Sequence, residues 1–216
     1  MAHMQIAVTW LGHASFRIDA ADKVIYIDPY RGEYTKKADL ILVSHSHFDH
    51  CDASTIEKIR KEATLVIAPR DCAATIQGSI TSRKPGEKTT FANITVEAVE
   101  AYNHRRFRSS GTPFHPKGLG VGYLIAMDGK TIYFAGDTDF IPEMKKLKDI
   151  HVALLPTDGT YTMDNHEAAE VALTIKPKYV IPMHHFNTDP REFKREVEAK
   201  SEVKVFPLRP GDQIQV

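Results

Sequence analysis

The chain has 216 residues, of which 42% are hydrophobic and 26% charged, a composition that supplies a sizeable core for one domain over residues 1–216. Lys+Arg and Asp+Glu both number 28, and this zero net charge argues against nucleic acid and an acidic membrane surface as partners. Two cysteines are too few for a disulfide scaffold, no apolar stretch reaches transmembrane length and no signal-peptide pattern opens the chain, so we expect a cytoplasmic protein. Met1-Ala2-His3-Met4 is interpreted as a remnant of cloning before a natural start at Met4.

Short strands separated by turns are predicted in the first part of the chain. The expected strands are residues 5–10, 14–19, 24–27, 40–43 and 64–68, with a helix at 53–62 and a short helix at 70–77. Asp28-Pro29 ends the third strand, because proline cannot continue a ladder of backbone hydrogen bonds. The continuous apolar run at 40–43 is typical of a strand covered on both faces.

The later part of the chain changes from hairpins to an alternation of helices and strands. Extended segments are predicted at 88–92 and 94–101, a loop at 102–118, and a hairpin of 121–127 with 131–135 across Asp128-Gly129. Helices are predicted at 141–147, 165–175 and 190–200, and strands at 152–156, 179–182 and 203–206. This order predicts an α/β protein, an αββα sandwich of two mixed β-sheets flanked by helices.

Three histidines and a carboxylate are concentrated in the stretch Ser44–His50, in the pattern His-x-His-x-Asp-His. Four such side chains cannot all point one way from a regular strand or helix. They can converge if the strand ends near Ser44 and the chain then turns tightly into the next helix. Imidazole nitrogen and carboxylate oxygen suit zinc and neighbouring divalent metals, so we predict a metal site here.

This pattern at the end of a strand resembles the signature of the metallo-β-lactamase superfamily. The opening Thr9-Trp10-Leu11-Gly12-His13-Ala14-Ser15-Phe16, followed by Ile27-Asp28-Pro29, resembles one branch of it, the small metal-dependent hydrolases similar to ascorbate-6-phosphate lactonase. The resemblance implies the αββα fold and two divalent metal ions per chain, with zinc expected first and manganese as the alternative.

The resemblance also implies which residues hold the metals. His104 follows an extended segment, Asp137 lies in Gly136-Asp137-Thr138, and His184 follows Pro182, in the order of the family's later motifs. Residue by residue, the implied ligands are His45, His47 and His104 for the first metal, Asp49, His50 and His184 for the second, and Asp137 as the carboxylate that bridges both. His185 directly follows His184, and the two could exchange roles.

Several further residues have expected roles beside the metals. Asp28 is placed to accept a ring N–H from a ligand histidine and so to fix its tautomer, whereas a simple strand-ending Asp-Pro is the alternative. His13 lines the cavity and contacts substrate, or is a structural histidine. Cys51 directly follows the ligand run, where a metal role is conceivable, but a buried or idle thiol is expected. His115 and His151 are expected to be surface histidines.

Hydrolysis is the expected reaction. A metal-bridging hydroxide would attack an electrophilic carbon or phosphorus, and Asp49 would orient this nucleophile and carry its proton to the leaving group. The implied substrates are lactones or related esters. Arg105, Arg106, Arg108 and Lys117 cluster within 13 residues and favour a small phosphorylated or carboxylated substrate, although a solvated basic loop is equally compatible. A homo-oligomer is compatible with the sequence.

Three alternatives remain open at this point. A phosphodiesterase uses the same dinuclear site. A thioester hydrolase or persulfide dioxygenase uses the same fold with mononuclear iron. The third is a metal-binding module without catalytic activity.

Overall fold

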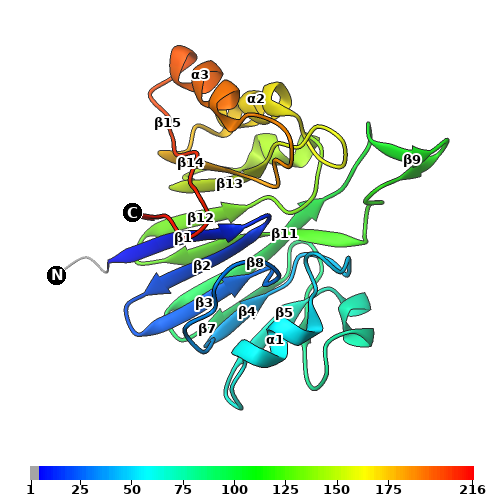
Figure 1. Ribbon diagram of the computed structural model, residues 1–216, viewed down its shortest axis with the longest axis vertical. Helices are drawn as coiled ribbons and strands as arrows, with labels where there is room; N and C mark the ends of the chain where they lie inside the picture. Colours follow the sequence, from blue (N-terminus) through cyan, green and yellow to red (C-terminus); the bar gives the residue numbers. More distant parts are fainter. Residues whose placement is uncertain (1–4) are drawn as a thin grey trace. The chain divides into compact units, whose positions relative to one another are not determined.

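The computed structural model describes residues 5–216, so the interpretation of Met1–Met4 lies outside the described residues. The chain forms two compact units. Unit 1 runs to Arg83 and takes up Leu208–Val216 again at the end of the chain, and unit 2 comprises Lys84–Pro207. Figure 1 shows the elements of both units in sequence colours. The single domain expected over residues 1–216 stays a prediction.

Unit 1 contains one seven-stranded mixed sheet in the order β16-β1-β2-β3-β4-β5-β6. Strands β16, β1, β2 and β3 pair antiparallel, whereas β3 to β6 pair parallel. The strands are β1 (Ile6–Gly12), β2 (Ser15–Ala20), β3 (Lys23–Ile27), β4 (Leu40–Leu42), β5 (Leu65–Ala68), β6 (Thr81–Ser82) and β16 (Gln213–Gln215). The predicted strands of this part are confirmed, whereas the two short edge strands β6 and β16 were not foreseen.

Helix α1 (Ala53–Ile59) follows the histidine-rich stretch. The Asp52 side chain accepts a hydrogen bond from Ser54 N and so caps the helix start, where the first backbone N–H groups lack partners inside the helix. Ile56 and Ile59 of α1 are buried in one apolar cluster with Ile41 and Val66 of the sheet. The helix predicted at 70–77 is a short 3-10 helix, η1 (Arg70–Ala74).

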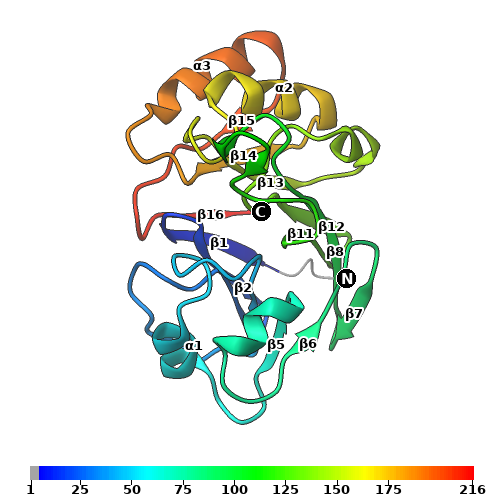
Figure 2. The same ribbon diagram turned by 90° about the vertical axis from the view of Figure 1, so that its right-hand side faces the viewer.

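Unit 2 also contains one seven-stranded mixed sheet, in the order β15-β14-β13-β12-β11-β8-β7. The strands are β7 (Lys88–Phe91), β8 (Ile94–Ala101), β11 (Gly120–Met127), β12 (Lys130–Phe134), β13 (Val152–Pro156), β14 (Tyr179–Met183) and β15 (Lys204–Val205). Strands β12 to β15 pair parallel, as the predicted alternation of helices and strands requires, and Figure 2 gives a second view of this sheet.

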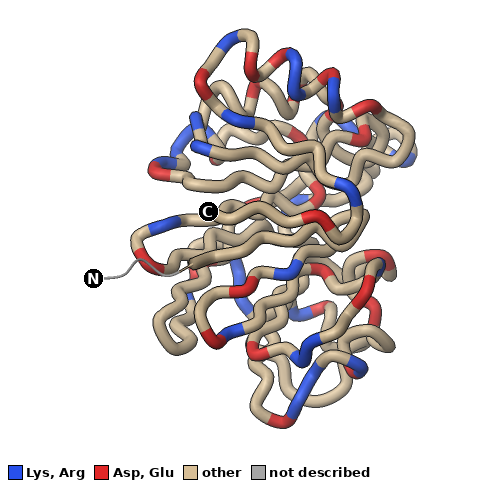
Figure 3. Tube along the Cα trace, turned by 60° about the vertical axis from the view of Figure 1, so that its left-hand side comes forward, with Lys and Arg blue, Asp and Glu red and all other residues tan. Residues whose placement is uncertain are grey.

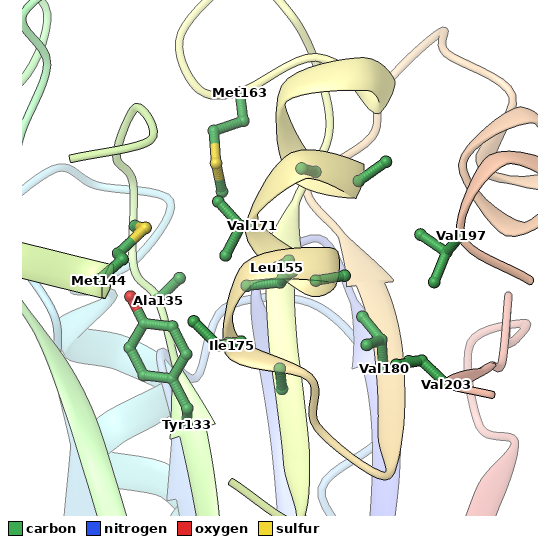
Figure 4. Packing of buried hydrophobic residues seen from close by; sticks show 14 of the residues in the cluster. Tyr133, Ala135, Met144, Leu155, Met163, Val171, Ile175, Val180, Val197 and Val203 are labelled. Carbon is green, nitrogen blue, oxygen red and sulfur yellow. The ribbon is translucent and has the colours of Figure 1, made fainter. Parts of the chain in front are cut away.

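Two helices are connected with the parallel strands of unit 2. Helix α2 (Asn165–Ile175) is capped by Asp164 and helix α3 (Pro190–Lys200) by Asp189, each through the side-chain oxygen. Apolar side chains of α2, such as Val171 and Ile175, share one buried cluster with Leu155 of β13 (Figure 4). The helix predicted at 141–147 is a 3-10 helix, η2 (Pro142–Lys146).

Two turns in unit 2 show what the sequence predicted and what it did not. The hairpin across Asp128-Gly129 is confirmed, with positive φ angles of 48° and 71°. The predicted loop at 102–118 contains a further hairpin, β9 (Phe107–Ser109) with β10 (Thr112–Pro113). Figure 1 shows this hairpin projecting from the strands of unit 2.

Basic and acidic residues are interspersed along the trace of both units (Figure 3), and their numbers balance to a net charge of zero. None of the helices among residues 5–216 is long and apolar enough to cross a membrane.

Candidate metal centre

The histidine-rich stretch lies where β4 ends and the chain turns toward α1. His50 N and Cys51 N both donate to His47 O, at 3.0 and 2.8 Å, and close a tight turn before the helix. His45 and His50 are buried, with exposed fractions of 2% and 0%. The predicted strand, turn and helix are therefore present, and the turn gives these side chains a common direction.

The imidazole rings of this stretch face one another closely. His45 Nε2 lies 3.1 Å from His47 Nδ1, and the ring centroids of His45 and His50 are 4.1 Å apart. Nitrogens of His45 and His50 and an oxygen of Asp28 all lie within 4.8 Å of one another. Imidazole nitrogens so close together are the donors that zinc and similar divalent metals prefer, so the residues present fit a metal.

Asp28 fixes the orientation of His50. Its Oδ2 lies 2.7 Å from His50 Nδ1, and the same carboxylate accepts hydrogen bonds from Ser44 N and Ser44 Oγ at 2.7 and 2.6 Å. Burial raises the pKa of Asp28, and its hydrogen bonds to His50 and Ser44 act in the opposite direction. With Nδ1–H directed at Asp28, Nε2 is the nitrogen through which His50 would bind a metal, and the role of Asp28 beside a metal ligand stays a prediction.

His13 contacts Asp49. Its Nε2 lies 3.1 Å from Asp49 Oδ2, and its side chain is 5% exposed. The backbone of His13 has a φ of 53°, in the left-handed region that few residues other than glycine adopt. Trp10 Nε1 donates to the His13 carbonyl at 2.9 Å and holds this turn. The predicted cavity histidine is therefore directed at the predicted catalytic carboxylate.

Asp137 is the centre of a second group, in unit 2. It follows β12 after Gly136, where φ is 67° and a Cβ would lie 2.9 Å from Val121 O, so only glycine fits without displacement. Asp137 Oδ2 lies 3.2 Å from His184 Nε2 and 3.3 Å from His115 Nε2. One carboxylate oxygen thus faces two imidazole nitrogens.

His184, rather than its neighbour His185, is directed at Asp137. It directly follows β14 with a φ of 48° and is 2% exposed. Its Nδ1 lies 2.9 Å from Asp158 Oδ2, so that the two ring nitrogens of His184 face two different carboxylates. Thr160 N and Tyr161 N donate to the other oxygen of Asp158, at 2.6 and 2.8 Å, and fix that carboxylate in turn.

His115 is the residue that sequence reasoning missed. The expectation that it lies on the surface is wrong, because it is only 4% exposed and contacts Asp137. Asn103 Oδ1 accepts hydrogen bonds from His115 N at 2.9 Å and from His115 Nδ1 at 2.7 Å, which leaves Nε2 for Asp137. Neither spacing nor a motif distinguishes His115 from other loop histidines, so the sequence offered no signal for it.

His104, the predicted ligand from the same loop, lies in a different environment. Its side chain is 39% exposed, and its Nδ1 is 3.8 Å from Asp139 Oδ2. Asp139 also accepts hydrogen bonds from His104 N and Arg105 N, at 2.8 and 2.7 Å. The structure therefore brings His115 to Asp137, whereas His104 belongs to the turn that Asp139 organises.

The basic loop is largely neutralised within the protein. Arg106 Nη1 lies 2.7 Å from Asp139 Oδ1 and 2.6 Å from Glu167 Oε2, and the Arg106 side chain is 12% exposed. Arg105, in contrast, is 61% exposed and lies 3.8 Å from Glu167. Burial would raise the pKa of Asp139, but its hydrogen bonds from Arg105 N, Arg106 and others outweigh burial and keep the pKa below its usual value. Arg106 thus has a structural role.

Comparisons with known proteins agree with this fold. Residues 7–184 match the family model described as the β-lactamase superfamily domain. The UPF0173 metal-dependent hydrolase of Thermococcus kodakarensis is 35% identical, over 98% of this chain and 100% of that protein. The corresponding protein of Pyrococcus furiosus is 36% identical, over 98% and 100%.

Solved structures give the same result. A protein of Parabacteroides distasonis described as a metal-dependent hydrolase aligns with a TM-score of 0.88 and 34% identity, over 94% of this chain and 92% of that one. Igni18, a metallo hydrolase of Ignicoccus hospitalis, aligns with a TM-score of 0.80 and 25% identity, over 98% of both chains.

The fold and the family model show that this chain is a protein of the metallo-β-lactamase superfamily, with two mixed β-sheets and flanking helices. The predicted fold class is confirmed. Within this superfamily, the chain belongs to the family of the UPF0173 metal-dependent hydrolases. The closer similarity to ascorbate-6-phosphate lactonase stays a prediction.

Proposed function

We propose that this chain is a metal-dependent hydrolase that opens a lactone or cleaves a related ester with two divalent metal ions, zinc first and manganese as the alternative. One observation supports this most directly. Two buried histidines have Nδ1 hydrogen-bonded to an oxygen, His50 to Asp28 and His115 to Asn103, and His184 Nδ1 lies 2.9 Å from Asp158 Oδ2. Histidines that bind metals through Nε2 are oriented in this way.

The proposed ligands follow the family's motif order with one change. His45, His47 and His115 would hold the first metal, with His115 in place of His104. Asp49, His50 and His184 would hold the second, and Asp137 would bridge the two. The change rests on unit 2, where His115 and His184 both face the same oxygen of Asp137. A carboxylate that binds two cations offsets their mutual repulsion.

Divalent metals at these residues supply an activated water and a Lewis acid for the substrate oxygen. The protein's own groups then have separate tasks. Asp49 would orient the nucleophilic water, accept its proton and pass this proton to the leaving oxygen as the ester bond breaks, and His13 holds the Asp49 carboxylate at 3.1 Å. Asp28 and Asn103 keep the imidazoles of His50 and His115 in one tautomer, so that these rings need no reorientation during the reaction.

We propose a small-molecule substrate and cytoplasmic residence. Arg106 forms ion pairs with Asp139 and Glu167, whereas the Arg105 side chain is exposed. Of these two arginines, Arg105 is therefore the one that would bind a carboxylate or phosphate of the substrate. Both cysteines are free thiols, in keeping with a reducing compartment.

Two measurements test the function. Elemental analysis of the purified protein should give two zinc or manganese ions per chain. A screen of lactones against bis-aryl phosphodiesters should give turnover of lactones that chelation abolishes and added metal restores. One iron per chain would contradict the metal assignment, and faster turnover of the phosphodiesters would replace lactone opening by phosphodiester cleavage. A protein with both metals bound and no turnover of either class would contradict the hydrolase proposal.

A further inference from the structure

Three aromatic side chains of unit 2 form a connected row that ends at His184. The rings of Phe114 and Tyr161 meet edge to face with centroids 4.8 Å apart, and Tyr161 meets Phe186 at 6.0 Å. Phe186 in turn meets the His184 ring at 4.8 Å and an interplanar angle of 85°. These distances lie in the range of about 4.5–7 Å that aromatic pairs prefer.

This aromatic row is exposed where the rings point outward. Tyr161 is 40% and Phe186 53% exposed, and Phe114 is partly buried. Large apolar side chains that lie together at a surface mark binding sites more often than isolated ones do. The row is therefore a surface on which an apolar group can lie next to a proposed metal ligand.

The same side chains that orient the proposed ligands also position Tyr161. Asp158, which contacts His184 Nδ1, accepts the hydrogen bond from Tyr161 N at 2.8 Å. Asn103, which orients His115, donates through Nδ2 to Tyr161 O at 3.0 Å. The backbone of Tyr161 is thus fixed from both sides by the two groups that set the geometry of the candidate metal centre.

Phe186 has a strained backbone, with a φ of 33°. This left-handed region is unusual for a bulky residue, and strain of this kind concentrates at binding and catalytic sites. A glycine would adopt this conformation without strain. A phenylalanine at position 186 is therefore less favourable for the stability of the fold than a glycine would be. A role of the Phe186 ring in binding would explain its presence.

We propose that Phe114, Tyr161 and Phe186 bind an aryl group of the substrate beside His184. This inference rests on the proposed function and adds the substrate class to it. An aryl group continues the edge-to-face pattern of the row, whereas an aliphatic group only covers apolar area. The nearby Arg106 is paired with Asp139 and Glu167, and Arg108 lies over the Phe114 ring at 5.9 Å from its centroid, so this guanidinium already uses the row as an aromatic surface.

The first experiment measures binding without turnover. The zinc-loaded full chain is titrated with 4-fluorobenzyl alcohol, followed by fluorine NMR, and then challenged with cyclohexylmethanol as an aliphatic competitor. Phe186→Gly and Tyr161→Ala should each weaken the affinity for the aryl probe about five- to ten-fold. Phe107→Ala, at another exposed phenylalanine on β9, should bind the probe as the wild type does.

The melting temperature separates binding from a structural role. Phe186→Gly should melt at or above the wild-type temperature, because glycine relieves the strained backbone. A markedly lower melting temperature in Phe186→Gly would indicate that the ring serves the fold, and would overturn the inference. Equal affinity of this variant and the wild type for the probe, or equal affinity of the wild type for the aryl and aliphatic alcohols, would also overturn it.

The second experiment uses substrates. The ratio of kcat/KM for α-phenyl-γ-butyrolactone to that for α-methyl-γ-butyrolactone should exceed one in the wild type and fall toward one in Phe186→Gly, mainly through KM. Turnover of both lactones with a ratio of one would overturn the aryl site and leave the hydrolase proposal standing. Turnover of neither would contradict the hydrolase proposal, and the probe titration would still decide the aryl site.

Discussion

At the scale of single residues, the side chains of the candidate centre are positioned in two ways, by the ends of strands and by contacts within a long loop. Asp28 directly follows β3 and precedes a proline, and His184 directly follows β14, so regular structure fixes where both lie. His115 lies in a long loop, and its position depends on Asn103, twelve residues earlier, and on Asp137 after β12. Such contacts between distant residues leave no periodic pattern in the sequence.

Substitution of the two candidate histidines distinguishes their roles. We expect His115→Ala to lose one metal ion per chain or to bind it far more weakly, because a ligand is removed. His104→Ala should keep both metals, since His104 is 39% exposed and faces Asp139. Metal stoichiometry and affinity measured by calorimetry check this. Metal loss in His104→Ala together with full retention in His115→Ala would reverse the assignment.

Asn103 provides a finer test of the same site. Asn103→Leu removes the acceptor for His115 Nδ1–H, so metal affinity should fall about 10–100-fold. Asn103→Asp keeps an acceptor oxygen at this place and should lose less affinity. Competition with a chromophoric chelator measures both variants. Unchanged affinity in Asn103→Leu would show that the tautomer of His115 does not depend on this contact.

At the scale of elements, strands and helices with long apolar patterns were predicted within a few residues. The two- and three-residue strands β6, β9, β10 and β16 were missed, because so short a strand exists only through its pairing partner. The basic loop was expected to bind an anionic substrate. Arg106 of this loop instead forms ion pairs with Asp139 and with Glu167 of α2.

This connection predicts a large effect of one arginine on stability. Arg106→Met leaves Asp139 and Glu167 buried without their cation, and breaking such a buried pair costs about 3–5 kcal/mol. Arg105→Met is the matched control, because Arg105 is 61% exposed, and should change the free energy of unfolding by less than about 0.5 kcal/mol. Urea unfolding of both variants measures the difference. Equal stabilities would show that the loop is not held by Arg106.

At the scale of the whole molecule, the pattern of carboxyl pKa values predicts instability in acid. Hydrogen bonds lower the pKa of Asp189 through Arg191, of Glu196 through Lys200 and of Glu198 through Val205 N. A carboxyl with a lowered native pKa contributes stability that is present above its unfolded value of about 4 and is lost as the pH falls through the native value. Thermal stability should therefore fall below about pH 4.

Asp189→Asn isolates one of these contributions. Asparagine can still cap α3 but carries no charge, so the variant should be less stable than the wild type near pH 7 and equal to it at the acid end. Melting curves from pH 7 down to acid values show whether the two converge. A constant difference across this pH range would assign the effect to the helix cap alone.

Unit 1 is not continuous in the sequence, because β16 returns to pair with β1 after all of Lys84–Pro207. During synthesis on a ribosome, all residues of unit 2 are therefore made before β16, the edge strand that pairs with β1. Vectorial synthesis should let Lys84–Pro207 acquire its native contacts first. Until the last strand emerges, Ile6–Gly12 offers unsatisfied backbone groups that a chaperone can hold.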